Sequence, residues 1–331
     1  MLKECSLALC DEYDLAILDL DGVVYIGSSA VDGAPAHLKA ASASGLHLAY
    51  ITNNAARPPS AVAEHLRTLD VAAQDEDVVT SAQAAARLVA EQVPAGAAVF
   101  VIGGKGLFEA LAEHGLVAVQ AISDEPAAVV SGYHPDLLWK TVISGAILVR
   151  RGLPWVASNM DLTVPTVDGP GPGNGVLVDA VARYAGRDPA VAGKPQRPLF
   201  EETIRRVGGK HPVVVGDRLD TDIEGAVNSG FDSLLVMTGV TGLAELVAAL
   251  PATRPSYISA DLGGLSTPHP VPATGDGDSL NGWFAAVEGG MLVVRGAGAV
   301  DDWWRVVASA AWGHLDTHGE PVDVSALVVP R

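Results

Sequence analysis

The sequence predicts an α/β protein: a doubly wound, mainly parallel sheet, an inserted second α/β domain and a small C-terminal extension. Short apolar runs alternate with amphipathic helical stretches, which is the pattern of repeated βαβ units. Breaker clusters near 94–96 and 186–189 set a middle block apart. The chain has 331 residues, and at roughly 150 residues per domain this length suggests about two domains.

The core elements follow in order along the chain. Strands are expected where apolar or β-branched runs stand between turn residues, at 15–18, 46–52, 213–215 and 233–237. Helices are expected over the amphipathic stretches, at 35–44, 60–69, 82–92, 221–228 and 243–250. Gly45, Gly230 and Pro251 are expected to end helices, and Ser81 to cap the helix that begins at Ala82.

The middle block and the C-terminal part have their own elements. The block is expected to contain strands at 99–102, 127–130 and 155–158 and helices at 107–113 and 137–149. A segment rich in Pro, Gly, Ser and Asp over 266–278 predicts a linker. Beyond it we expect strands at 283–287, 291–294 and 322–329 and a helix from 301 to about 314. The predicted domains are a core of 1–94 with 188–265, an insert of 95–187 and a C-terminal module of 266–331.

Composition excludes several classes of protein. With 21 Lys and Arg against 39 Asp and Glu, the net charge is −18, which argues against nucleic acid or an anionic membrane as partner. The longest apolar run, 142–149, is far shorter than the ~20 residues of a spanning helix. Cys5 and Cys10 are the only cysteines, too few for a disulfide framework or a tetrahedral zinc site. We therefore expect a cytoplasmic protein without a membrane or nucleic-acid partner.

Two acidic motifs follow predicted strands directly. Asp19 and Asp21 stand at the end of the first strand, and Gly22 lets the chain turn sharply after them. The second motif, Gly216-Asp217-Arg218-Leu219-Asp220-Thr221-Asp222, follows the run of valines at 213–215. Carboxylates crowded in a cleft repel one another unless a cation joins them, and oxygen ligands of this kind suit Mg²⁺. The sequence thus predicts an acidic, Mg²⁺-binding site at the carboxyl edge of the sheet.

Two further motifs offer groups that bind phosphate. Thr52, Asn53 and Asn54 end the second predicted strand and supply a hydroxyl, amides and backbone N–H donors. Lys194 lies in the Gly193-Lys194-Pro195 loop before a helix and supplies a compact positive charge. A lysine with nearby donors is what an anionic substrate of this strongly acidic protein requires.

The four motifs together resemble those of the haloacid dehalogenase (HAD) superfamily of phosphatases. The motifs occur in the family's order, as DLDGVVYIG, TNN, GKP and GDRLDTDI, and the resemblance covers roughly residues 14–265. The forms are most similar to the NagD-type, phosphoglycolate, pyridoxal-phosphate and glycerol-3-phosphate phosphatases. This resemblance implies a HAD-type, Rossmann-like core with an inserted cap domain.

The resemblance also implies a role for each motif. Asp19 would be the nucleophile that forms an aspartyl-phosphate, and Asp21 the general acid and base. Mg²⁺ would be held by the Asp19 carboxylate, the Asp21 backbone carbonyl and Asp217, while Asp222 would support the ion from behind or through water. The residues implied to grip the phosphoryl group are Thr52, Asn53, Asn54 and Lys194.

The substrate implied by the resemblance is a small phosphate ester. The segment from Ser158 to Pro165 resembles the loop with which the family's cap selects its substrate. Val164 stands where pyridoxal-phosphate-selective relatives place a histidine, which argues against that substrate. Our first choice is glycerol 3-phosphate and our second is 2-phosphoglycolate, with a nucleotide monophosphate as a third option. Ala55, where relatives often carry serine, departs from the pattern without removing any group the chemistry needs.

Other interpretations stay open at this point. Asp19 and Asp21 alone could be a solvated strand end, and Asp217 with Asp222 alone a helix N-terminal cluster. A phospho-signalling receiver also combines acids, threonine and lysine on a parallel sheet, although the second acid Asp21 and the large insert argue against it. Residues 271–331 could form a binding or regulatory module or a homodimer contact, because the family core does not need them.

Overall fold

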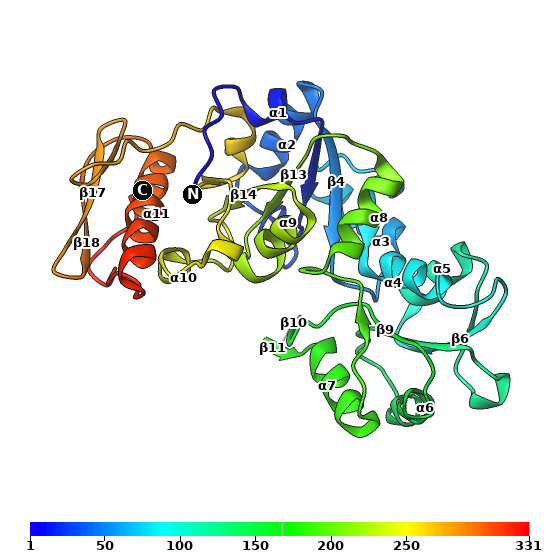
Figure 1. Cartoon of the computed structure of the whole chain (residues 1–331). Helices are drawn as coiled ribbons and strands as arrows, with labels where there is room; N and C mark the ends of the chain where they lie inside the picture. Colours follow the sequence, from blue (N-terminus) through cyan, green and yellow to red (C-terminus); the bar gives the residue numbers. More distant parts are fainter. Residues whose placement is uncertain (167–168, 331) are drawn as a thin grey trace. The chain divides into compact units, whose positions relative to one another are not determined.

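The computed structural model describes residues 1–166 and 169–330, and the chain forms two compact units (Figure 1). One unit combines residues 1–48 with 209–331, and the other is residues 49–208. The second unit contains the whole predicted insert, 95–187, together with flanking elements that we expected in the core. The domain boundaries given above therefore stay a prediction. No helix among the described residues combines the length and the apolar character needed to cross a bilayer.

The first unit contains four parallel strands in the order β15-β14-β13-β1. Their bounds are Tyr257–Ser259, Asp232–Val236, Pro212–Gly216 and Leu15–Leu18. Every residue of β1 and β13 is buried, as expected for strands covered on both faces. The α-helices of this part are α1 (Leu9–Glu12), α2 (Ala34–Ala43), α9 (Glu224–Ser229) and α10 (Leu243–Val247). A short hairpin of β2 (Tyr25–Ile26) and β3 (Ser29–Ala30) follows β1.

The second unit is again a parallel sheet with helices. Strand β4 (His47–Thr52), whose first two residues belong to the first unit, pairs in parallel with β5 (Val78–Thr80). A five-stranded sheet has the order β12-β9-β8-β6-β7, with bounds Ala190–Val191, Trp155–Ala157, Ala128–Ser131, Ala98–Ile102 and Val117–Val119. Strands β10 (Thr163–Thr166) and β11 (Gly169–Pro172) form a separate antiparallel pair. The helices are α3 (Pro59–Thr68), α4 (Ser81–Ala90), α5 (Lys105–Glu113), α6 (Trp139–Arg150), α7 (Asn174–Ala185) and α8 (Arg197–Val207).

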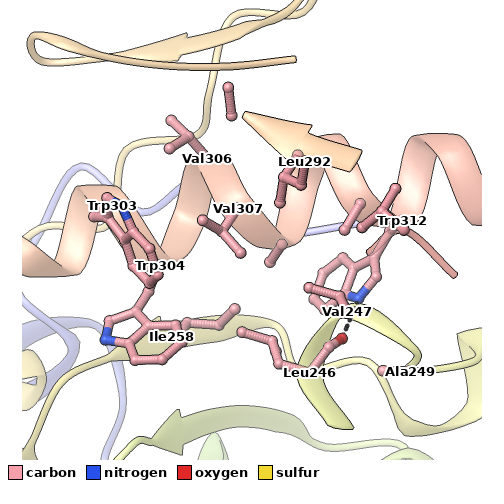
Figure 2. Packing of buried hydrophobic residues seen from close by; sticks show 14 of the residues in the cluster. Leu246, Val247, Ala249, Ile258, Leu292, Trp303, Trp304, Val306, Val307 and Trp312 are labelled. Carbon is pink, nitrogen blue, oxygen red and sulfur yellow. Dashed lines mark hydrogen bonds between the residues drawn. The ribbon is translucent and has the colours of Figure 1, made fainter. Parts of the chain in front are cut away.

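The C-terminal segment packs into the first unit through one long helix. Helix α11 (Val300–His318) lies against the antiparallel strands β16 (Asp278–Leu280), β17 (Trp283–Glu288) and β18 (Met291–Gly296) on one side. Figure 2 shows its other side, where Trp304 and Trp312 meet Ile258 and Leu246 in a buried apolar cluster. Trp312 Nε1 also donates a hydrogen bond of 2.8 Å to the Leu246 carbonyl. The module is thus an integral part of the unit's core rather than a loosely attached extension.

Four local expectations need correction. The predicted strand at 322–329 is wrong: Asp323 makes a single bridge to Met291, and the chain then turns. Residues 266–278 are not a loose linker, because His269 and Cys5 exchange backbone hydrogen bonds of 2.8 and 3.0 Å. Thr80, not Ser81, caps α4 and accepts from Gln83 N. The helix expected at 221–228 begins as a π-helical turn over Leu219–Ile223.

His269 is a buried histidine held in one tautomer. Its side chain is 1% exposed; Nδ1 lies 3.1 Å from Nη2 of Arg305, and Nε2 lies 2.8 Å from the Gly264 carbonyl. Because a guanidinium only donates and a carbonyl only accepts, Nδ1 is the acceptor and Nε2 carries the proton. Burial, with the Arg305 charge adding to it, lowers the pKa of His269 to about 4.

This depressed pKa predicts acid sensitivity. The unfolded chain takes up a proton at His269 near pH 6.5, whereas the folded protein does so only near pH 4. Stability from this group is therefore complete above pH 6.5 and falls by about 3 kcal/mol as pH drops to 4. Urea unfolding at pH 7.5 and 4.5 measures it, and we expect His269→Gln, which keeps a donor and an acceptor, to show a shallower pH dependence. Exposed His318→Gln is the control, and equal slopes for all three proteins would disprove the assignment.

Candidate active site

The first part of the site lies where β1 and β13 end. The two strands run in parallel with Leu18 opposite Val215, and Asp19 N donates to the Val215 carbonyl at 2.9 Å. Asp19 and Asp217 thereby follow the carboxyl ends of neighbouring strands, as the sequence predicted. Asp19 is 9% exposed, whereas Asp21 is exposed to solvent. The two acids of the motif thus occupy different environments.

Three buried carboxylates meet at this edge. Asp19, Asp217 and Asp222 each offer one oxygen, and these oxygens all lie within 4.8 Å of one another. An octahedral Mg²⁺ with ligands at about 2.0–2.1 Å places its ligand oxygens roughly 3–4 Å apart, which this grouping can meet with little movement. Three hard oxygen donors without nitrogen or sulfur fit Mg²⁺ better than a transition metal. The donor set therefore fits the ion that the resemblance implies.

A loop after β14 fixes Asp217. Val240 N donates to Asp217 Oδ2 at 2.6 Å, and Thr241 N donates to the Asp217 carbonyl at 3.1 Å. Thr238 Oγ1 donates at 2.6 Å to the carbonyl of Gly22, which has φ +86° and so suits glycine. A Cβ on Gly22 or on Gly239 would overlap the Asp217 carboxylate. This loop was not predicted from the sequence as part of the site.

The close approach of Gly239 gives a test of the acidic group. We expect Gly239→Ala to push the Asp217 carboxylate aside and to weaken Mg²⁺ binding by about tenfold, the scale of a lost supporting contact around a metal. Titration calorimetry with MgCl₂ measures the affinity. Gly313→Ala in α11, where a Cβ meets nothing within 4 Å, is the matched control. Wild-type affinity in Gly239→Ala would show that Asp217 takes no part in metal binding.

The second part of the site lies in the other unit, after β4. Thr52 is buried, and its Oγ1 accepts a hydrogen bond of 3.0 Å from Asn54 N. The Asn54 side chain is half-buried and accepts from Ala56 N at 2.9 Å, which holds the loop in a tight turn. Thr52 and Asn54 are thus braced locally at the end of a parallel strand.

Asn53 and Lys194 are brought together in this same unit. Both are buried; Asn53 Oδ1 accepts from Lys194 N at 2.8 Å, and Asn53 Nδ2 lies 3.2 Å from the Lys194 carbonyl. The two residues are 141 positions apart in the chain, so the fold itself creates this pair. The structure thus joins the predicted phosphate motifs within the second unit, and the predicted acids within the first.

Three polar residues after β9 and β11 belong to this network. Asn159 and Asp161 lie in the segment that resembles the substrate-selecting loop, but their contact with Asn53 was not predicted, and neither was the part played by Asn174. Asn159 Nδ2 donates to the Asn53 carbonyl at 2.6 Å, Asn53 Nδ2 donates to Asp161 Oδ1 at 3.0 Å, and Asn174 Nδ2 donates to the Asn159 carbonyl at 2.7 Å. The available signal was the polar run that follows the apolar strand at 155–157. Sequence order alone does not indicate which distant loop such a run contacts.

Comparisons with known proteins agree with this arrangement. Residues 16–117 match the family model described as haloacid dehalogenase-like hydrolase, and residues 191–265 match one described as HAD-hydrolase-like. The chain is 40% identical over 330 residues to D-glycerol 3-phosphate phosphatase from Mycobacterium tuberculosis, covering 96% of this chain and 92% of that protein. It is 34% identical over 237 residues to acid sugar phosphatase from Staphylococcus aureus, covering 71% and 90%.

Solved structures of phosphatases are also similar to this chain. A glycerol phosphate phosphatase from M. tuberculosis, crystallised in complex with magnesium, superimposes with a TM-score of 0.85 at 40% identity, covering 93% of this chain and 92% of that one. A 4-nitrophenylphosphatase from Thermotoga maritima superimposes with a TM-score of 0.71 at 29% identity, covering 78% and 98%. The resemblance seen in the four motifs is confirmed, and the chain belongs to the haloacid dehalogenase-like hydrolases.

Proposed function

We propose that this protein is a Mg²⁺-dependent phosphomonoesterase that hydrolyses glycerol 3-phosphate through an aspartyl-phosphate on Asp19. The observation that carries the proposal is the group of three buried carboxylates around Asp19 at the ends of β1 and β13. Three buried carboxylates repel one another unless a cation neutralises part of their charge. A nucleophilic carboxylate also requires a cation, because it must approach a phosphate dianion of the same charge.

Asp19 and Asp21 would divide the chemistry. The Asp19 carboxylate attacks phosphorus, and the ester oxygen leaves with the electrons of the broken P–O bond. Asp21, which is exposed two residues after Asp19, would protonate the leaving alkoxide and then take a proton from the water that attacks the acyl phosphate. Phosphate is released and Asp19 is regenerated, so the net reaction consumes one water.

The remaining residues would bind charge. Asp19 and Asp217, with the Asp21 backbone carbonyl, would hold Mg²⁺, and Asp222 would complete the acidic group directly or through a water. When bound, the ion supplies positive charge that offsets the repulsion between carboxylate and phosphate. Thr52, the loop that follows it and the Lys194 ammonium would stabilise the phosphoryl oxygens. Their position in the family's motif order supports this assignment.

The choice of substrate rests on the relative from M. tuberculosis. That protein is named for D-glycerol 3-phosphate and matches this chain over 96% of its length, which includes most of the C-terminal module. Phosphate release should be measured with both enantiomers of glycerol 3-phosphate, 2-phosphoglycolate and nucleotide monophosphates. We expect the highest kcat/KM for glycerol 3-phosphate. A higher kcat/KM for another ester would overturn the choice of substrate. Phosphorylation of one site per protein without further turnover would favour a phospho-signalling receiver.

A further inference from the structure

The hydrogen bonds of Asn53 place it in a role different from the one its motif implies. The resemblance counts Asn53 among the residues that grip the phosphoryl group. We propose instead that Asn53 is a positioning residue, which fixes the Lys194 backbone and ties it to the loop after β9 that carries Asn159 and Asp161. The catalytic part of this inference rests on the proposed function, and its structural part does not.

The orientation of the Asn53 amide is fixed by its partners. A backbone N–H can only donate, so the atom that faces Lys194 N at 2.8 Å must be the amide oxygen. The amide nitrogen then has two hydrogens, which are directed to Asp161 Oδ1 at 3.0 Å and to the Lys194 carbonyl at 3.2 Å. Both donor hydrogens are occupied, so the side chain has none left for a phosphoryl oxygen.

The same residue receives further bonds through its backbone. The Asn53 carbonyl accepts from Ser81 Oγ and from Asn159 Nδ2, each at 2.6 Å. Asn159 Oδ1 in turn accepts from Asp161 N at 3.1 Å. Asn53, Asn159 and Asp161 thus form a closed, partly buried set of hydrogen bonds in which each member orients another. The Asn53 amide thus links the 159–161 loop to the Lys194 backbone, in addition to the pairing of β12 with β9.

Close packing leaves this amide little freedom. A Cβ on Gly193, the residue before the lysine, would lie 2.5 Å from Asn53 Oδ1 and 2.6 Å from the Ser158 carbonyl. Only glycine lets the lysine loop approach both partners at once. Asn53 is itself 8% exposed, so its polar atoms depend on these partners rather than on water. The Asn53 side chain therefore contacts the Lys194 backbone at both its N–H and its carbonyl.

The structural part is tested by amide hydrogen exchange at Lys194 in the full-length protein without ligand. Asn53→Ala removes the acceptor of the Lys194 N–H, and we expect its exchange to accelerate at least tenfold. Gln92→Ala, which removes one exposed amide from the same unit, is the matched control and should leave exchange unchanged. Unchanged Lys194 protection in Asn53→Ala, with an unaltered melting temperature, would overturn the inference whatever the activity.

The catalytic part is tested by a double-mutant cycle on kcat and KM. We expect Asn53→Ala to lower kcat by about 100-fold, the scale of a misplaced catalytic group. Asp161→Asn keeps an acceptor for Asn53 Nδ2 and should lose less activity than Asp161→Ala, which we expect to lose about tenfold. Adding Asp161→Ala to Asn53→Ala should have little further effect. If the losses in kcat caused by the two substitutions multiply in the double variant, Asn53 and Asp161 act independently and the proposed link between them is overturned. If the wild type is inactive but Lys194 exchange accelerates in Asn53→Ala as expected, only the proposed function is rejected.

Discussion

Asp19→Asn is expected to reduce phosphate release by at least about 10⁴-fold while the protein stays folded, because an amide cannot form the phospho-enzyme. The variant also removes one of three buried carboxylates that repel one another. Its melting temperature without metal should therefore equal or exceed that of the wild type. Steady-state phosphate release and thermal unfolding measure the two effects.

A neighbouring acid provides the control for this substitution. Asp220 lies between Asp217 and Asp222 in sequence, but it is exposed and forms an ion pair with Arg218 at 2.7 Å. Asp220→Asn should keep wild-type turnover, since an exposed pair of this kind contributes little. Turnover by Asp19→Asn at a rate close to that of Asp220→Asn would exclude Asp19 as the nucleophile.

Asp21→Asn is expected to have the second-largest effect, a loss of about 10²–10⁴-fold in steady-state turnover. The substitution keeps the backbone carbonyl, so Mg²⁺ affinity should change little. With para-nitrophenyl phosphate, whose leaving group departs without protonation, the first step should survive and the second should slow. A rapid-mixing experiment should then show a burst of nitrophenolate that approaches one per enzyme. A wild-type rate without a burst would remove Asp21 from the acid and base role.

The grouping of Asp19, Asp217 and Asp222 could be predicted from the sequence because its determinants are local. Asp19 and Asp217 each follow a short apolar run, and parallel strands present their carboxyl ends at one edge. Asp222 lies five residues after Asp217, and the π-helical turn between them returns its carboxylate to the group. Strand ends and short spacings of this kind can be read directly from residue order.

The polar network around Asn53 could not be predicted in the same way. In sequence, Asn53 lies more than 100 residues from Asp161 and from Lys194. Each of the three residues stands in an ordinary loop. Nothing in residue order indicates that both amide hydrogens of Asn53 are used within the protein. The motif resemblance implied a phosphoryl contact for this residue, whereas the hydrogen bonds of its side chain are all to protein groups.

Composition misled at the C-terminus. The Pro- and Gly-rich stretch 266–278 has the residues of a linker, yet His269 is buried within it and pairs with Cys5. The predicted helix after it was correct, since Trp304 and Trp312 are buried on α11. Because these side chains cover Ile258 and Leu246, removal of residues 271–331 should expose an apolar core surface (Figure 2). A truncated chain would therefore test folding rather than regulation.

Trapping of the covalent intermediate tests the central claim most directly. Asp21→Asn is mixed with para-nitrophenyl phosphate and Mg²⁺, because this leaving group needs no proton from Asp21, and is then quenched with borohydride. The quench converts an aspartyl-phosphate into homoserine, which peptide mass spectrometry locates. The account predicts homoserine at position 19 alone, and none when Asp19→Asn is combined with Asp21→Asn. Homoserine at any other aspartate, or phosphate release with no modified residue at all, would contradict it.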